Sequence, residues 1–381
     1  MLPKIPTPPV ELPAPCVMEP HRLWRKPKAL RHAREHSLKI AHRVMERRRE
    51  AAAQAPRQAF AQHHSGEAHR AFFHSQIKPL LAQLPEGFHA LEVGGGMGLL
   101  SALAAAHSTG RILSTELYWL RDSPKAFQHA GTYARFLESE PLLRNVLTVD
   151  SAEDGLPLRT HFHPQRLQLA VASGHDLPVR SASMDFVFSL NCLEHIPNLT
   201  RYNQESHRVL KLGGLFYNST QPLYASAFGH HAEDFFPLPW GHLLWSPEEF
   251  AELVVKHSGG DREWVPGEPL RPAHLLEQIY PTLNGARHVE FRRALRCTPW
   301  KVIGWVEEMA DWRHQGWAAQ MELTRAVTIS ADDLQITGLK MLLQKTDRTG
   351  FLSPHQLWLS RWQREFGKID LSQGLGQLFW G

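Results

Sequence analysis

From residue 88 onward, short apolar runs alternate along the chain with longer stretches of helical periodicity. The runs have the length and the β-branched and aromatic content of strands, and several are apolar throughout. Strands that alternate with helices predict a parallel sheet, and fully apolar strands predict that helices cover both of its faces. The predicted strands are 88–93, 111–117, 167–172, 184–190 and 214–219, and the predicted helices are 99–107, 124–138 and 199–210.

The N-terminal region differs in texture from this alternating part. Residues 1–20 are dense in proline, which predicts an extended arm. Residues 22–50 are rich in Arg, Lys and His with sparse apolar positions, as in a basic helix with a thin apolar stripe. The favoured interpretation is a helix that packs on the domain through this stripe. The alternative is an electrostatic contact surface for an anionic partner.

The C-terminal half predicts elements added to the alternating domain. Residues 300–320 predict a helix, because Trp305, Met309, Trp312 and Trp317 are spaced for a buried face. Residues 334–345 predict a late strand that returns to the sheet edge. An insertion is expected at 145–165, because the connection there is longer than a crossover needs. The predicted domains are an arm and basic helix at 1–70, a main domain at 71–346 and a tail at 347–381. Within the main domain we expect a core at 85–222 and a helical insertion, which could serve as a lid, at 261–330.

Composition narrows the class of protein. The 42 Lys+Arg against 38 Asp+Glu leave a net charge of +4, too small an excess to indicate nucleic-acid binding by itself. Cys16, Cys192 and Cys297 lie far apart, which suits a reducing compartment and excludes a disulfide scaffold. No run approaches the ~18 apolar residues of a membrane span. We therefore expect a soluble, cytoplasmic protein.

A glycine-rich turn carries the strongest chemical signal. The predicted strand at 88–93 contains Glu92 and leads through Gly94, Gly95, Gly96 and Gly98 into a predicted helix. Ligands of open parallel sheets bind beyond such strand ends, where glycines allow close backbone approach. The G-x-G-x-x-G fingerprint of dinucleotide sites fails, since Leu99 takes its last position.

A second acidic residue, Glu116, ends the next predicted strand, where a carboxylate can accept hydrogen bonds from ribose hydroxyls. The pair of acids therefore predicts a nucleoside site without an arrangement for a pyrophosphate.

Together with three later motifs, this loop resembles the class I S-adenosylmethionine-dependent methyltransferases, specifically the small-molecule type with a methyltransferase-11-like domain. The motifs are S-G-H-D-L-P followed by S-M-D-F-V at 173–187, N-C-L-E-H-I at 191–196 and R-V-L-K-L-G-G at 208–214, with Leu212 in place of the usual proline. The resemblance covers about residues 85–222. It implies an α/β fold with a Rossmann-like, doubly wound, mostly parallel sheet, and S-adenosyl-L-methionine as the cofactor.

The resemblance also implies roles for individual residues. Glu92 and the glycine loop would hold the methionine end of the cofactor, and Glu116 would bind its ribose. The remaining cofactor contacts would be Leu117 on the adenine, Ser173, Gly174 and His175 at the adenine edge, and Asn191 and Leu193 beside the methyl group. Cys192 is interpreted as a packing residue, because the Pro-Cys of cytosine methylation is absent.

His195 is the first candidate for a general base, because histidine titrates near neutrality and this one follows the strand that borders the methyl group. In this family string the histidine can also serve packing alone. A second cluster after the fifth strand supplies His230, His231 and His242 as further candidates, with Asp234 nearby. Tyr224, Trp240 and Trp245 of the same stretch are the candidate acceptor contacts, or else a structural aromatic cluster. No metal site is predicted, since no tight histidine spacing supports one.

The function expected from the sequence is transfer of a methyl group to a hydroxyl of a small molecule, such as a saccharide or secondary metabolite, in preference to an amine or carbon. The alternative is a nucleic-acid methyltransferase or binder that uses the basic N-terminal arm. Against this alternative, the arm has few aromatic residues for base stacking.

Overall fold

The computed structural model describes most of the alternating region and the basic helix. The described residues are 24, 27–54, 67–96, 98–117, 137, 139–149, 160–233, 235–258, 262–265, 268–270, 276, 280–309, 324 and 327–347. The proline-rich arm, most of the predicted helix at 124–138 and nearly all of the predicted tail lie outside them.

A seven-stranded sheet forms the centre of the fold, in the order β10-β11-β7-β6-β1-β2-β5. Neighbours among β5, β2, β1, β6 and β7 pair in parallel, and β11 pairs antiparallel with both β7 and β10. The chain runs outward from β1 and then returns to β6 on the other side of β1. The sheet is therefore doubly wound, and its switch point lies between β1 and β6. The bounds are β1 His89–Val93, β2 Arg111–Glu116, β5 Leu167–Val171, β6 Met184–Leu190, β7 Leu210–Thr220, β10 Trp300–Met309 and β11 Ile336–Lys345.

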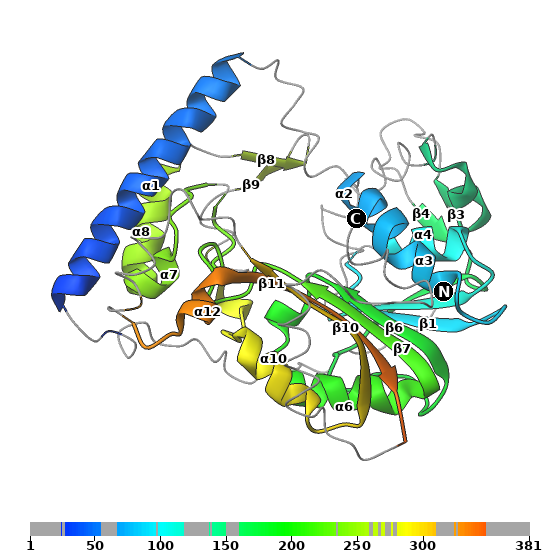
Figure 1. Ribbon diagram of the computed structural model, residues 1–381. Helices are drawn as coiled ribbons and strands as arrows, with labels where there is room; N and C mark the ends of the chain where they lie inside the picture. Colours follow the sequence, from blue (N-terminus) through cyan, green and yellow to red (C-terminus); the bar gives the residue numbers. More distant parts are fainter. Residues whose placement is uncertain are drawn as a thin grey trace.

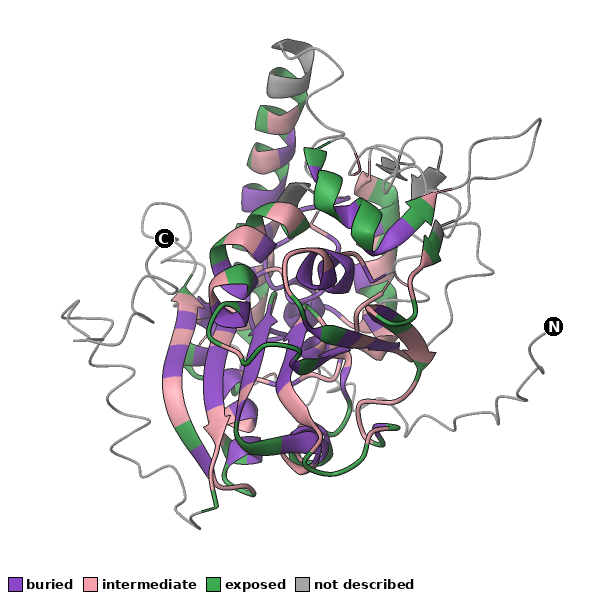
Figure 2. Ribbon diagram, turned by 90° about the vertical axis from the view of Figure 1, so that its right-hand side faces the viewer, coloured by how far each residue is buried: buried purple, intermediate pink, exposed green. Residues whose placement is uncertain are grey.

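Helices cover both faces of this sheet (Figure 1). One face carries α2 (Glu67–Phe72), η3 (Phe73–Ile77), α3 (Lys78–Leu81) and α4 (Leu99–Ala106), and the other carries α6 (Leu199–Val209) and α10 (His288–Leu295). Alternate residues of one strand enter the two cores: Phe186 and Phe188 pack on the first side, and Val187 on the second. Burial on both sides explains why this strand has apolar residues at three successive positions instead of strict alternation. In Figure 2 the central strands are largely buried, and exposed residues lie on the outer parts of the helices, on loops and at strand ends.

A third hydrophobic cluster lies beside the sheet, under the N-terminal helix. Helix α1 (Pro27–Gln54) buries Ala33, Ile40, Ala41 and Met45 against the segment that contains α7 (Gly241–Leu244) and α8 (Pro247–His257). Figure 1 shows α1 running alongside α8 and α7. The predicted basic helix and its packing through an apolar stripe are confirmed.

All five predicted strands of the alternating region are present, as are the predicted helices at 99–107 and 199–210. The late strand is also present, but β10 occupies the sheet edge, so β11 lies one position further in. The insertion at 145–165 contains β3 (Leu147–Val149) and β4 (Thr160–Phe162), which pair antiparallel in a sheet of their own.

The predicted helix at 300–320 is wrong for its described part, because Trp300–Met309 forms strand β10. Val302, Ile303 and Val306 are β-branched and favour an extended chain. A register shift between Val302 and Gly304 interrupts the alternation. Trp300 and Trp305 consequently enter the same core although they are five residues apart, which imitates helical spacing.

The predicted insertion at 261–330 is therefore not helical throughout. Its described part contains β8 (Arg262–Val265), β9 (Glu268–Leu270), η8 (Tyr280–Thr282), α10 and β10. The remaining short helices with bounds within the described residues are η5 (Pro141–Asn145), η6 (Leu193–His195) and α12 (Ala331–Gln335). Within the described residues, no helix combines the length and apolarity that a bilayer crossing requires.

Candidate active site

The predicted site residues follow the carboxyl ends of neighbouring parallel strands. The glycine loop follows β1, Glu116 ends β2, and Ser173 lies just after β5. Asn191 follows β6 directly and His195 ends the short η6. Because the strands are parallel and adjacent, these segments share one edge of the sheet, at the switch point where open α/β sheets bind ligands.

The glycine loop is shaped so closely that side chains would not fit at three of its positions. A Cβ on Gly94 would lie 2.1 Å from Cys192 Sγ, and one on Gly95 would lie 2.0 Å from Ser114 Oγ. A Cβ on Gly98 would meet Leu169 at 2.9 Å. Gly96 differs, since nothing lies within 4 Å of its Cβ position, and its φ of +53° favours glycine. Neighbouring side chains therefore fill the space beside Gly94, Gly95 and Gly98, whereas the space beside Gly96 is open.

Glu116 lies directly at this open part of the loop. Its Oε2 accepts the N–H of Gly96 at 2.9 Å, and its Oε1 accepts the N–H of Leu117 at 2.8 Å. A carboxylate has about four acceptor positions, so capacity for further donors remains. Glu116 and Leu117 are both half-buried and therefore partly accessible.

Glu92 lies deeper than Glu116, with a relative exposure of 3%. Its Oε2 accepts hydrogen bonds from the hydroxyls of Ser101, on α4, and Ser114, on β2. Burial raises the pKa of Glu92 to about 7, and the nearby charge of Glu116 adds to the rise. Glu92 lies opposite Ser114 on the adjacent parallel strand, two residues before Glu116, so the two acids lie at the same edge of the sheet.

The turn after β5 brings the predicted adenine-edge residues together. The Ser173 hydroxyl accepts the N–H of His175 at 3.2 Å, and the His175 carbonyl accepts Arg201 Nε at 3.0 Å. Gly174 packs against Val93 of β1, because a Cβ there would lie 3.3 Å from its side chain. The turn thus adjoins the end of β1.

The segment after β6 leaves the strand through a left-handed residue. Asn191 is exposed and adopts φ +47°, a conformation that non-glycine residues adopt mainly at turns and functional sites. Leu193 is buried, and Cys192 packs on the glycine loop. Burial is the main cause that raises the pKa of the Cys192 thiol, so this group stays protonated. Its position agrees with the predicted packing role.

His195 and His231 meet although they are distant in sequence. Their ring centroids lie 5.5 Å apart, and His195 Nδ1 is 2.8 Å from Thr282 Oγ1. Burial lowers the pKa of His195 to about 4 and that of His231 to about 3, so both are neutral near pH 7. His231 adopts φ +59°, a strained conformation of the kind found at functional sites.

Glu194 completes this group and was missed from the sequence. Ligand-type atoms of Glu194, His195 and His231 all lie within 4.8 Å of one another. Glu194 Oε2 accepts the Thr220 hydroxyl at 2.5 Å, whereas Oε1 has no hydrogen-bond partner among the side chains of the described residues. Burial raises the pKa of Glu194 to about 7. The sequence signal that could have identified Glu194 is its position next to His195 in the turn that follows β6.

His230 and His242 extend the histidine cluster away from the open edge, with ring centroids 5.2 Å apart. His230 is fully buried and satisfied at both nitrogens: Nε2 donates to the Leu238 carbonyl at 3.0 Å, and Nδ1 accepts the Ala232 N–H at 2.9 Å. His242 Nε2 donates to the Tyr224 carbonyl at 2.5 Å. The contacts of both histidines hold the backbone of the loop together.

The predicted acceptor aromatics lie in the cluster under α1. Tyr224, Trp240 and Trp245 have relative exposures of 4%, 1% and 6%. Arg34 of α1 lies over the Trp245 ring at 5.4 Å from its centroid. These contacts are those of a structural aromatic cluster, and contact with an acceptor stays a prediction. Asp234 lies outside the described residues.

Two groups of the described residues could hold a metal ion by the placement of their ligand atoms. One is Glu194, His195 and His231. The other is His74, His107 and Glu140, on the α2–α4 side of the sheet, which the sequence did not single out. The predicted absence of a metal site stays a prediction.

The strand order and the glycine loop at the switch point together define a Rossmann-like, doubly wound α/β fold. The sequence model described as a methyltransferase domain matches residues 129–218, which include β5, β6, α6 and most of β7. This part of the chain is therefore similar to methyltransferase domains, and the glycine loop precedes the matched stretch. No curated protein matches the sequence.

Solved structures with a similar fold are distant from this chain. The [4+2]-cyclase SpnF is 13% identical, with 71% of this chain and 80% of that chain covered and a TM-score of 0.36. Geranyl diphosphate C-methyltransferase from Streptomyces coelicolor A3(2) is 12% identical, with 71% and 76% covered and a TM-score of 0.36. The YcgJ protein from Bacillus subtilis is 12% identical, with 75% and 99% covered and a TM-score of 0.36. At these values the similarities bear on neither substrate nor mechanism.

Proposed function

We propose that the protein transfers a methyl group from S-adenosyl-L-methionine to a hydroxyl of a small molecule, such as a saccharide or secondary metabolite. The observation that carries this proposal is the position of His195. It ends the η6 turn that follows β6, at the sheet edge shared with the glycine loop, and its neutral imidazole adjoins His231 and Glu194. A hydroxyl that is methylated must lose its proton, and a neutral imidazole can accept it.

The cofactor would be held at the ends of β1, β2 and β5. The open face of Gly96 and the spare acceptor positions of Glu116 suit a ribose, with Leu117 and the turn of Ser173, Gly174 and His175 around the adenine. Glu92 would fix the loop from below through its serine contacts. Asn191 and Leu193 would border the reactive end. Bound S-adenosyl-L-methionine supplies a methyl group already activated by its sulfonium.

Because the donor is activated, the task of the protein is to place the acceptor oxygen in line with the methyl group and to remove its proton. Holding the two reactants in the correct geometry can lower the activation free energy by up to ~7–11 kcal/mol. With the Nδ1 proton of His195 donated to Thr282 Oγ1, its Nε2 lone pair is available to the acceptor hydroxyl. Glu194, one of whose carboxylate oxygens lies within 4.8 Å of a nitrogen of each imidazole, would stabilise the imidazolium that forms.

The experiment uses methyl-labelled S-adenosyl-L-methionine with a panel of hydroxylated saccharides and secondary metabolites. Label transfer identifies an acceptor, and His195→Ala is then compared with the wild type. We expect turnover to fall by about 10²–10⁴-fold, the usual contribution of a general base, with unchanged cofactor affinity.

His89→Ala is a matched control, because His89 is exposed at the start of β1, at the opposite end of that strand. Full activity in His195→Ala would exclude this residue as the base. Label found only on amines or carbons would contradict the hydroxyl assignment. Failure to bind the cofactor at all would contradict the whole proposal.

A further inference from the structure

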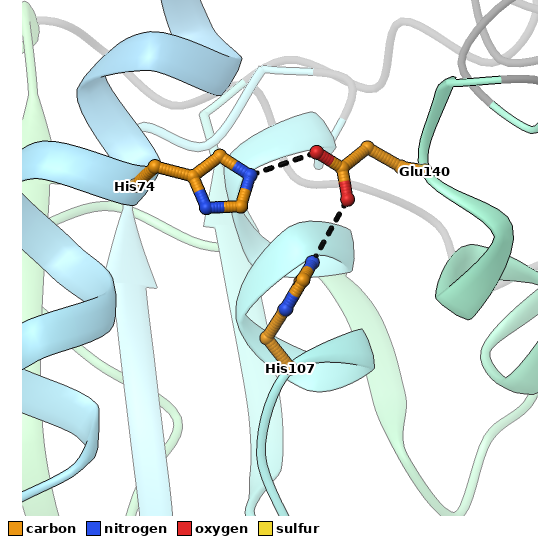
Figure 3. Close-up of side chains that lie close together, drawn as sticks. All are labelled: His74, His107 and Glu140. Carbon is orange, nitrogen blue, oxygen red and sulfur yellow. Dashed lines mark hydrogen bonds and ion pairs between the residues drawn. The ribbon is translucent and has the colours of Figure 1, made fainter.

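A second histidine–carboxylate cluster lies on the α2–α4 side of the sheet and consists of His74, His107 and Glu140. In Figure 3 both imidazoles point toward the Glu140 carboxylate. Glu140 Oε1 accepts a hydrogen bond from His74 Nε2 at 2.7 Å, and its Oε2 accepts one from His107 Nε2 at 3.0 Å. The three residues come from separate elements: His74 lies in η3, His107 is the C-cap of α4, and Glu140 is the N-cap of η5. The fold therefore brings them together from distant parts of the sequence.

The environment of the cluster is enclosed but accessible from one side. The side chains of Glu140 and His107 are 9% and 10% exposed, whereas that of His74 is 37% exposed. The Phe73 ring packs against both imidazoles, with centroids 5.2 Å from each. Although burial acts to raise it, the hydrogen bonds of the two histidines lower the pKa of Glu140, which stays ionised. An ion could thus enter past His74.

The helix that supplies His74 is irregular at this residue. Phe73–Ile77 form a π-helical turn between α2 and α3. Such turns are rare and occur frequently at functional sites. This distortion is independent of the hydrogen bonds and marks the same residue.

We propose that His74, His107 and Glu140 form a binding site for a divalent transition-metal ion, with zinc as the best match. Two imidazole nitrogens and one carboxylate oxygen are a donor set that zinc takes in four-coordinate sites, with water as the fourth ligand. In such a site each imidazole ligates through Nε2 and carries its proton on Nδ1. The two hydrogen bonds to Glu140 are then replaced by bonds to the metal.

The spacing of the ligand atoms suits this exchange. Metal–nitrogen bonds of ~2.0–2.1 Å place tetrahedral ligands about 3.3 Å apart. One ligand atom from each of the three residues lies within 4.8 Å of the others, so no pair has to approach by more than about 1.5 Å. The two imidazoles contact different oxygens of Glu140, at 2.7 and 3.0 Å, so binding to a single oxygen also requires the carboxylate to turn. Arg70 lies 3.7 Å from Glu140 Oε1. With Oε2 as the ligand, its guanidinium would become the outer partner of the other oxygen, an arrangement common around metal carboxylates.

The metal would act at the opposite end of α4 from the cofactor loop, because α4 begins at the Gly98 N-cap and ends at His107. The ion would connect η3, the end of α4 and the start of η5, where hydrogen bonds to the Glu140 side chain now connect them. The inference does not rest on the proposed methyl transfer, since it predicts a structural ion that stabilises the fold whatever the acceptor.

The test uses the full chain without a histidine tag, freed of metal by a chelator and titrated with zinc against a chromophoric competitor. We expect one site with a Kd of about 1 μM or tighter, and a higher unfolding temperature with zinc. His74→Ala and Glu140→Gln should each weaken zinc binding at least tenfold. Cobalt should give the visible absorption of a four-coordinate site that is lost in the same variants.

His195→Ala is the matched control, because it removes a histidine from the other candidate group and should leave zinc affinity unchanged. His74 is part-exposed, so its replacement by alanine should leave the fold intact, and circular dichroism checks this. Absence of zinc binding would overturn the proposal, as would binding that survives both His74→Ala and Glu140→Gln. Loss of zinc only in His195→Ala would place the ion in the other group and also overturn it. S-adenosyl-L-homocysteine titrated into the same variants tests the cofactor site separately.

Discussion

The contact between Glu116 and the glycine loop gives the sharpest test of the cofactor site. The perturbation is Glu116→Ala, which removes the acceptor of the Gly96 and Leu117 amides and the expected partner of the ribose. Glu116 is partly accessible and Gly96 has free space around it, so the side chain is not needed to fill a core. The loss should therefore be one of binding and not of folding.

The magnitude follows from the bonds that the carboxylate makes. A hydrogen bond to a charged group contributes about 1.5–3 kcal/mol. Without the carboxylate, the N–H groups of Gly96 and Leu117 can form hydrogen bonds with water instead. The expected loss of cofactor affinity is therefore that of one hydrogen bond, the bond between Glu116 and the ribose. About 1.5–3 kcal/mol corresponds to roughly 10- to 150-fold weaker binding.

The assay is isothermal titration calorimetry with S-adenosyl-L-homocysteine, which needs no acceptor. Glu116→Gln, which keeps one acceptor oxygen, should lose less affinity than Glu116→Ala. Glu86→Gln is a suitable control, because Glu86 is exposed in the turn before β1. An unchanged titration for Glu116→Ala would refute the ribose assignment.

Two further predictions concern stability. Burial raises the pKa of Glu92 from 4.5 to about 7, so its contribution to folding is complete below about pH 4.5 and is lost as the pH rises through 7. The free energy of unfolding of the wild type should therefore fall between pH 4.5 and pH 8, and Glu92→Gln should make this fall smaller by about 3 kcal/mol. Urea denaturation at the two pH values measures it. An equal fall in variant and wild type would contradict the prediction. Phe250 is fully buried beneath α1, so Phe250→Ala should cost about 3–5 kcal/mol in thermal or chemical unfolding. A loss below about 1 kcal/mol would mean that this cluster repacks freely.

Much of the fold could be predicted because a strand that is buried on both faces of the sheet has apolar residues at successive positions. Met184–Leu190, for example, has apolar residues at the successive positions 186–188, which is typical of a strand covered on both faces. Strand β10 was missed for an equally physical reason. Its register shift at Val302/Gly304 destroys the period of two, and β11, the strand it pairs with, is distant in sequence. Local pattern cannot reveal a partner that only tertiary pairing supplies.

The same difference between local sequence pattern and tertiary packing decides which residues of the candidate site could be predicted. Residues at strand ends, such as Glu92 and Glu116, could be predicted because parallel neighbours bring their ends to one edge. The meeting of His195 with His231 depends on the packing of the loop after β7, which no local periodicity encodes. Burial likewise decides that Tyr224 and Trp240 lie in a core, although their types suit a binding surface equally well.

Helix α1 connects these observations, because it holds the segment that carries His231. Ser37 donates to the Pro239 carbonyl at 2.6 Å, just before α7, and Arg34 donates to the carbonyl of Leu244, the last residue of α7, at 2.6 Å. Arg48 donates to the Glu233 carbonyl at 2.8 Å, two residues beyond His231. The polar residues of α1 that face the domain thus fix the backbone of the loop that meets His195. Arg34 and Arg48 are thus engaged within the chain, and the position of His231 beside His195 depends in part on the N-terminal helix.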